Sequence, residues 1–139
     1  MDLPCTLAEL AAAHPGDRVA LAAPGRTPLT FGALGKLADE TIASLNAFGI
    51  GRNDRVAVVL PNGPEMAAAF LAIGAGATVA PLNPAYREDE FHFYLGDLSA
   101  RALVVSGDEN GPSVDAAGRL GIPLLRLIAR RRTDVVRGR

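Results

Sequence analysis

Cysteine and lysine each occur only once in this 139-residue chain, as Cys5 and Lys36. One cysteine can form neither an internal disulfide nor a cysteine-based metal site, so a reducing, cytoplasmic setting is expected. A reaction that needs a lysine has one candidate. Tryptophan is absent and aromatic residues make up 5% of the chain. With 49% hydrophobic and 21% charged residues, the composition is that of one folded domain, not of a disordered chain.

A stretch without charge runs from Met66 to Tyr86, which is long enough for a helix that crosses a bilayer. Gly74 and Pro81 lie within this stretch and divide it, so we expect a buried helix followed by a buried strand and no membrane span. The N-terminus has no basic residue before His14, unlike a secretory signal, so no export signal is expected.

Charge is distributed unevenly along the chain. Residues 126–139 contain 6 arginines and 1 acidic residue, whereas the preceding part contains 8 basic and 14 acidic residues. An arginine-rich segment can bind nucleic-acid phosphates or anionic lipid. Because no aromatic residue or folded basic face accompanies this segment, we expect no nucleic-acid partner. We assign residues 1–127 to the folded domain and residues 128–139 to a basic tail.

Hydrophobic periodicity predicts alternating strands and helices after a short hairpin. Thr6 and Glu9 have the spacing of a capping box, which predicts a helix through Ala13. Residues 18–22 and 28–30 form the predicted hairpin. The further predicted helices span 31–48, 64–74, 88–98 and 114–120, and the predicted strands span 56–60, 78–82, 102–105 and 123–127. This alternation predicts an α/β domain with a mostly parallel sheet of about four strands, flanked by helices.

Common motifs for phosphate, nucleophile and metal chemistry do not occur in the sequence. The glycine pairs at 49–51 and 74–76 precede predicted strands, so they are interpreted as helix ends and not as dinucleotide fingerprints. His14 and His92 are far apart in the sequence, and a surface or packing role is expected for both. The acidic cluster at 88–90 begins a predicted helix, where the helix dipole stabilises it without any catalytic role.

Two loops follow predicted parallel strands, at the edge of the sheet where open α/β proteins bind ligands. These loops contain Asn62–Gly63 and Asn83–Arg87. The alternative is that both are ordinary turns, in which asparagine and glycine serve the backbone conformation.

Four strings occur in order along the chain: LTFGAL at 29–34, GIGRNDRVAVVLPNGPE at 49–65, AAFLAIGAGATVAPLNPAYREDE at 68–90 and DLSARALVV at 97–105. Together they resemble the N-terminal part of the adenylate-forming acyl-CoA synthetases, the AMP-dependent synthetase and ligase superfamily. Within it the sequence is most similar to the oxalate–CoA ligase and fatty-acid–CoA ligase group. The similarity extends from about Thr6 to Leu127.

The resemblance implies a two-step reaction. A carboxylate attacks ATP, with Mg²⁺ assisting, to give an acyl-adenylate and pyrophosphate, and coenzyme A then displaces AMP to give a thioester. The family's phosphate loop, its adenine and ribose motifs and its adenylation lysine would lie downstream of these residues. Lys36 does not match that lysine, because it occupies the polar face of an N-terminal helix. The chain is therefore expected to be inactive alone.

The resemblance suggests one site residue, since some relatives have a basic side chain just after the Asn-Pro turn, near the nucleotide end of coenzyme A. Arg87 follows Asn83-Pro84 here and can pair with a phosphate. The alternative is a solvated arginine that pairs with Glu88 or Glu90 on its own helix.

A second hypothesis concerns the end of the chain. A relative would continue into more of the same domain after Leu125, so the arginine-rich end is expected to mark a truncation. Such a remnant would be a non-catalytic interaction module, pairing with itself or with a full-length relative through exposed apolar surface.

Overall fold

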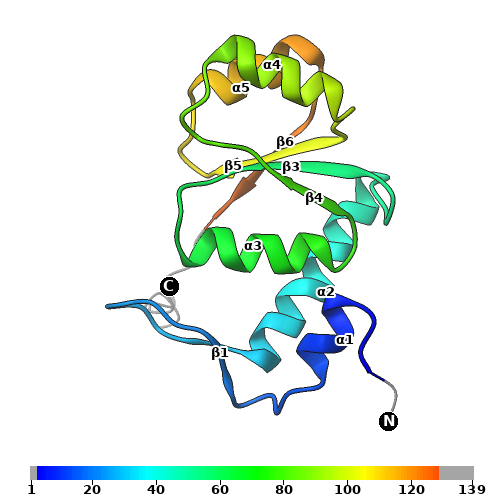
Figure 1. Cartoon of the computed structure of the whole chain (residues 1–139), viewed down its shortest axis with the longest axis vertical. Helices are drawn as coiled ribbons and strands as arrows, with labels where there is room; N and C mark the ends of the chain where they lie inside the picture. The colour runs from blue at the N-terminus through cyan, green and yellow to red at the C-terminus, as the bar shows by residue number, and fades with distance from the viewer. Residues whose placement is uncertain (1–2, 129–139) are drawn as a thin grey trace, which may run out of the picture.

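The computed structural model describes residues 3–128 (Figure 1). Its centre is a parallel sheet in the order β4-β3-β5-β6. The strands are β3 (Arg55–Val59), β4 (Thr78–Pro81), β5 (Ala102–Ser106) and β6 (Leu124–Leu127). The predicted α/β class, parallel sheet and four-strand size are confirmed. Residues 129–139, which make up most of the predicted basic tail, lie outside the described residues, so the domain boundary stays a prediction.

The N-terminal region forms a small unit beside the sheet. It contains α1 (Leu7–Ala12) and an antiparallel hairpin of β1 (Val19–Leu21) and β2 (Leu29–Thr30), as predicted. The capping box is present, because the Glu9 N–H donates to the Thr6 hydroxyl and the Glu9 carboxylate accepts from the Thr6 N–H. This reciprocal pairing satisfies backbone groups that a short helix would otherwise expose.

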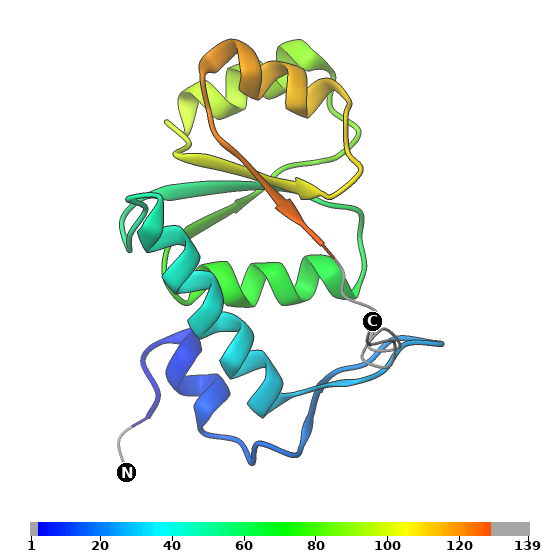
Figure 2. The same cartoon turned by 180° about the vertical axis from the view of Figure 1, so that it is seen from behind.

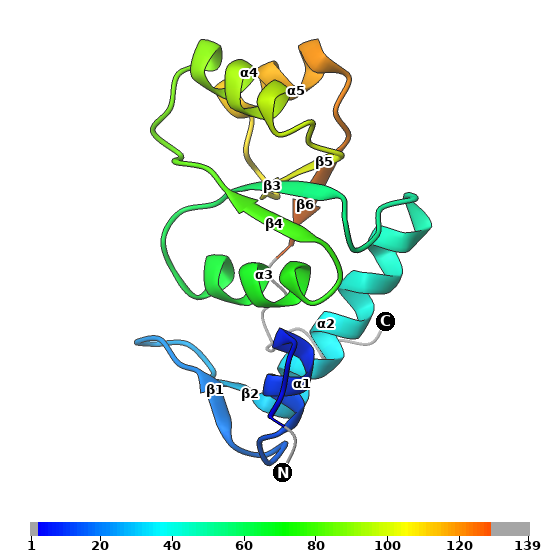
Figure 3. The same cartoon turned by 45° about the vertical axis from the view of Figure 1, so that its right-hand side comes forward.

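Helices cover both faces of the parallel sheet (Figure 3). On one face, α2 (Phe31–Ala47) and α3 (Pro64–Gly74) bury Leu45, Ala69 and Ile73 against β3 and β5. On the other face, α4 (Glu88–Asp97) and α5 (Pro112–Leu120) form a second core around Phe91 and Leu95. Strand side chains alternate between the two cores, which explains why β3 reads as a continuous apolar run.

One detail of the predicted sheet is wrong. The segment after α3 is a strand, but it is not buried on both faces. Thr78 and Pro81 are exposed and the two residues between them are half-buried, because β4 is an edge strand. Pro81 lacks an N–H and is tolerated at an edge. Among residues 3–128, no helix is long and apolar enough to cross a membrane.

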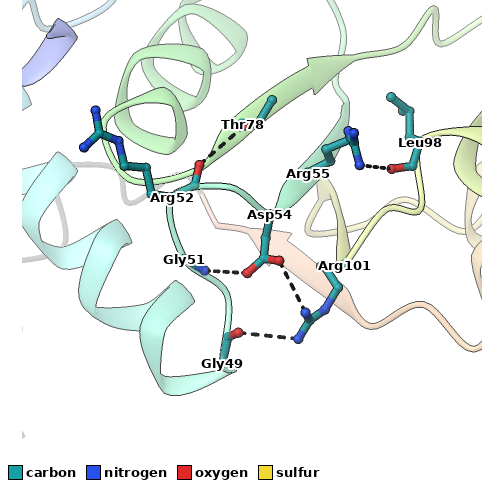
Figure 4. Close-up of polar contacts among 8 residues, drawn as sticks. All are labelled: Gly49, Gly51, Arg52, Asp54, Arg55, Thr78, Leu98 and Arg101. Carbon is teal, nitrogen blue, oxygen red and sulfur yellow. Dashed lines mark hydrogen bonds and ion pairs between the residues drawn. The ribbon is translucent and has the colours of Figure 1, made fainter.

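The amino ends of the strands are joined by polar contacts (Figure 4). The Asp54 carboxylate accepts from the Gly51 N–H at 2.8 Å and from the Arg101 guanidinium at 3.3 Å. Arg101 also donates to the Gly49 carbonyl at 3.4 Å. Gly49 has a φ of 72°, a left-handed conformation that ends α2 at low cost for glycine. These contacts tie the turn before β3 to the start of β5, and they are structural.

Candidate functional site

The loops at the carboxyl edge of the sheet form the candidate site. They comprise residues 60–63 after β3, 82–87 after β4 and 107–111 after β5. β3 and β5 are neighbours, yet α3 packs on one face of the sheet and α5 on the other. The loops after β3 and β5 therefore diverge, as at the switch points where open α/β sheets bind ligands.

The sequence analysis missed the loop after β5, since its importance depends on the strand order. The Arg126 guanidinium of β6 donates to the carbonyls of Gly107 at 3.3 Å and Glu109 at 2.6 Å. The Glu109 carboxylate accepts from the Gly111 N–H at 2.8 Å. Glycines at both ends of this loop are the only sequence signal that could have indicated it.

The loop after β4 contains the predicted Asn83 turn. The Asn83 side-chain oxygen accepts from the Ala85 N–H at 2.9 Å, and its backbone carbonyl accepts from the Tyr86 N–H at 3.1 Å. Asparagine side chains stabilise turns in this way. The contacts therefore support the turn interpretation for Asn83 itself, and the turn places Arg87 at the start of α4.

Arg87 is the predicted phosphate-binding residue, and its side chain is 78% exposed. Its Nε atom lies 3.7 Å from an Asp89 carboxylate oxygen and 3.8 Å from one of Glu90. The Glu90 carboxylate also accepts from the Arg87 N–H at 2.8 Å. Glu88 does not pair with Arg87 but with Arg119 of α5, at 2.9 Å. An exposed guanidinium in such weak ion pairs remains accessible to a phosphate.

An aromatic stack that the sequence analysis did not recognise lies beside this loop. Tyr86 stacks on Tyr94 of α4, with ring centroids 5.1 Å apart, and meets Phe91 edge-on at 5.7 Å. Burial of the phenol, followed by the neighbouring Tyr94, raises the pKa of Tyr86 above its usual range. The stack fixes the loop against α4, because aromatic pairs of this geometry are favourable beyond the area they bury.

The other residues considered in the sequence lie elsewhere. His14 stacks on Phe31 at 4.3 Å, which agrees with a packing role. Cys5 is a free, exposed thiol, and Lys36 is exposed on α2. The acidic cluster forms the first turn of α4, as predicted. Across residues 3–128, no three His, Cys, Asp or Glu side chains gather in a way that could hold a metal ion.

Comparison with known proteins finds a matching family and several similar proteins. The sequence model of the AMP-binding enzyme family matches residues 7–134. The chain is 42% identical over 108 residues to an oxalate–CoA ligase of Arabidopsis thaliana, covering 76% of this chain and 21% of that protein. It is 38% identical over 117 residues to the probable CoA ligase CCL9 of Humulus lupulus, covering 84% of this chain and 22% of that protein.

Two solved structures contain a segment whose fold is similar to that of this chain. A putative long-chain-fatty-acid CoA ligase from Rhodopseudomonas palustris has a TM-score of 0.74 and 27% identity, covering 87% of this chain and 31% of that one. The N-terminal domain of FACL13 from Mycobacterium tuberculosis has a TM-score of 0.66 and 24% identity, covering 83% of this chain and 29% of that one. The chain thus spans less than a third of each relative it matches here.

Proposed function

Because the chain belongs to the AMP-binding enzyme family, we propose that it is the N-terminal part of an ATP-dependent acyl-CoA ligase. In that reaction a carboxylate oxygen attacks the α-phosphorus of ATP and pyrophosphate leaves. The sulfur of coenzyme A then attacks the acyl carbon, and AMP leaves. The observation that carries the proposal is 42% identity to an oxalate–CoA ligase over 108 residues. The single cysteine supports a reducing, cytoplasmic setting for it.

We propose that residues 3–128 do not themselves carry out the attack on ATP. Attack on ATP requires cations and N–H donors where charge develops on the phosphates. The Gly49–Gly51 and Gly74–Gly76 pairs lie before strands, and the phosphate loop that the resemblance implies would lie beyond these residues. We therefore assign no step of adenylation to these side chains, and we expect the chain by itself to be inactive.

The purified 139-residue chain is predicted to form no acyl-adenylate. It would be incubated with ATP, Mg²⁺, coenzyme A and either oxalate or a long-chain fatty acid, and release of AMP and pyrophosphate would be measured. We expect no release above a blank without protein, while a complete oxalate–CoA ligase in parallel releases both. Turnover by the pure chain would contradict the proposed inactivity.

Arg87 is proposed to contact a phosphate of coenzyme A. The support is its exposure at the start of α4, beside a loop at the carboxyl edge of the sheet. In a full-length ligase that contains this segment, Arg87→Glu should raise the KM for coenzyme A about fivefold, since an exposed charged contact contributes about 1 kcal/mol. Arg52→Glu, at the opposite edge, is the control. Equal KM values for both variants would remove Arg87 from the site.

The second candidate function is a non-catalytic interaction module. Large apolar side chains on the surface support it, with Phe48 58% exposed and Phe93 64% exposed. A module of this kind would pair with itself or with a full-length relative. Light scattering on the pure chain tests the first possibility, and a monodisperse monomer at high concentration would count against self-pairing.

A further inference from the structure

Aromatic side chains gather on the surface of α4, across the sheet from α2 and α3. Both tyrosines of the chain and two of its five phenylalanines lie between residues 86 and 94. Phe91 is buried in the core, whereas Phe93 is 64% exposed and Tyr94 is 37% exposed. The rings of Phe93 and Tyr94 meet edge-on with centroids 5.3 Å apart, and Tyr94 stacks on Tyr86. Exposed clusters of this kind on folded domains mark places where another molecule binds.

Two carboxylates lie in line with the exposed rings. We call the residues Glu90, Phe93, Tyr94 and Asp97 the α4 stripe. Residues three and four apart along a helix lie on the same face, so these four side chains line one side of α4. Arg87 pairs with Glu90 at one end of the stripe, at 3.8 Å. Asp97, at the other end, is exposed and forms no ion pair within residues 3–128. The stripe therefore combines aromatic faces with negative charge.

Arginine is the side chain that such a surface favours. Its planar guanidinium stacks on aromatic rings and forms paired hydrogen bonds with a carboxylate. An anion would be repelled by the carboxylates at both ends of the α4 stripe. A purely apolar ligand would cover the rings but leave the neighbouring carboxylates without partners. The chemistry of the stripe thus favours a polypeptide segment rich in arginine.

The chain itself contains a segment of this kind. Residues 129–139 include five arginines, three of them consecutive at 130–132, and one acidic residue. By contrast, α4 has four acidic residues and no lysine or arginine. The two segments are oppositely charged, and this complementarity matches residues 129–139 to the α4 stripe.

The position of β6 decides which copy of the segment can reach the stripe. The carboxyl end of β6 points toward the hairpin and α3, and α4 lies on the other side of the sheet (Figure 2). The arginines at 130–132 follow Ile128 by two to four residues, which span at most about 14 Å when extended. The exposed side of α4 lies beyond both the sheet and the helix itself, whose diameter is about 10 Å. The segment of a second copy can approach this side directly, without a path around the sheet.

We propose that the α4 stripe binds the arginine-rich segment, residues 129–139, of a second copy of this chain. This rests on the second candidate function, the pairing of the chain with itself, and supplies the surface that the pairing uses. Two copies related by a twofold axis each offer one stripe and one segment, so both contacts form in a closed dimer. The second contact forms within the complex and strengthens the first.

Sedimentation equilibrium of the full 139-residue chain tests the proposal. We expect a dimer that weakens as NaCl is raised from about 0.05 to about 0.5 M, because salt screens exposed ion pairs. Asp97→Lys should raise the Kd of the dimer about tenfold or more, since the stripe would then repel arginine. Asp39→Lys is the matched control, because Asp39 is also an exposed aspartate within a helix but lies on α2. Equal Kd values for these two variants would overturn the proposal and leave self-pairing standing.

The aromatic part of the stripe is tested in the same way. Phe93→Ser should raise the Kd about threefold or more, because the guanidinium loses a ring on which to stack. Phe48→Ser should leave it unchanged, since Phe48 has a similar exposure, 58%, but follows α2 on the other side of the sheet. Thermal melts check that every variant remains folded. A dimer that Phe48→Ser dissociates and Phe93→Ser does not would overturn the proposal, because it would use the other face.

A charge exchange distinguishes the segment of a second copy from the chain's own. In a triple variant, Arg130, Arg131 and Arg132 are each replaced by glutamate, and we expect it to be monomeric alone, like Asp97→Lys. A mixture of the triple variant with Asp97→Lys should form a heterodimer, because the reversed charges of one face those of the other. A mixture that stays monomeric would overturn the proposal. A wild-type chain that is monomeric throughout would overturn both the proposal and the second candidate function.

Discussion

An ion pair between Arg26 and Glu65 links two segments that are far apart in the sequence. It joins the hairpin turn to the first turn of α3, with the Arg26 side chain 53% exposed and the Glu65 side chain 33% exposed. The hydrogen bond from Arg26 is the main cause that lowers the pKa of Glu65 below its usual value. The pair therefore stabilises the folded state only while Glu65 is ionised.

The contribution of this pair should depend on pH. A depressed folded-state pKa gives stability that is present above the ordinary pKa of glutamate and is lost as the pH falls through the folded-state value. Glu65→Gln should therefore lower the free energy of unfolding at pH 7 by up to about 1 kcal/mol, and by less at pH 3. Urea unfolding at both pH values measures this.

Glu65→Gln in an Arg26→Gln background shows whether Arg26 or the helix backbone stabilises the ionised Glu65 carboxylate. There, Glu65→Gln should have a smaller effect at pH 7, because the partner is already gone. An unchanged effect would mean that the backbone of the first turn of α3, and not Arg26, stabilises the Glu65 carboxylate.

At the scale of elements, α2 can lie close to the turn after α3 because Gly76 in that turn has no side chain. A Cβ atom added at Gly76 would lie 2.4 Å from Cγ1 of Ile42 on α2. Real atoms do not approach so closely, so Gly76→Ala must displace Ile42 or shift the helix. The sequence analysis interpreted Gly76 as part of a helix end, and close packing is the additional reason that the structure supplies.

Gly76→Ala should destabilise the protein by about 1–3 kcal/mol, the usual cost of overpacking a core. Gly35→Ala is the control: Gly35 lies within α2, and a Cβ atom there meets nothing within 4 Å. It should stabilise by about 0.5–1 kcal/mol, because alanine favours the helix. Denaturant midpoints measure both, and Ile42→Ala should relieve the effect at Gly76. Destabilisation that persists in the double variant would point to backbone strain instead.

For the whole molecule, burial predicts an order of local stability. β3 and β5 are central strands, and residues such as Val56 and Leu103 have no exposed surface. α1 has no buried residue. Amide hydrogen exchange should therefore be slowest in β3 and β5 and fastest in α1, since exchange follows local opening. Equal protection in α1 and β3 would show that the N-terminal unit unfolds together with the sheet.

Much of the local structure was predictable because its causes are local. Thr6 and Glu9 form the expected capping box, Pro64 begins α3, and Gly49 ends α2 in a left-handed conformation. Each depends on residues within one helical turn. The alternation of strand and helix likewise follows from the period of apolar residues, which is why the α/β class could be predicted.

Strand order and the open surfaces could not be predicted in the same way. The segment at 78–82 looked buried because most of its residues are apolar, but the apolar content of a strand does not reveal how many neighbours it will have. The importance of the loop at 107–111 depends on β5 lying beside β3 and on α5 packing opposite α3. Pairings between distant segments decide both, and no short window of sequence contains them.

The sequence by itself determined the elements, their caps and the family resemblance, since these depend on the identity and spacing of neighbouring residues. Only the tertiary structure decided which surfaces stay open. Leu125 and Phe48 are 77 residues apart in the chain, yet both line the apolar hollow between the hairpin, α2, α3 and β6. An apolar residue in a sequence is equally compatible with a core and with an interface. What covers it is decided by the packing of all the elements at once.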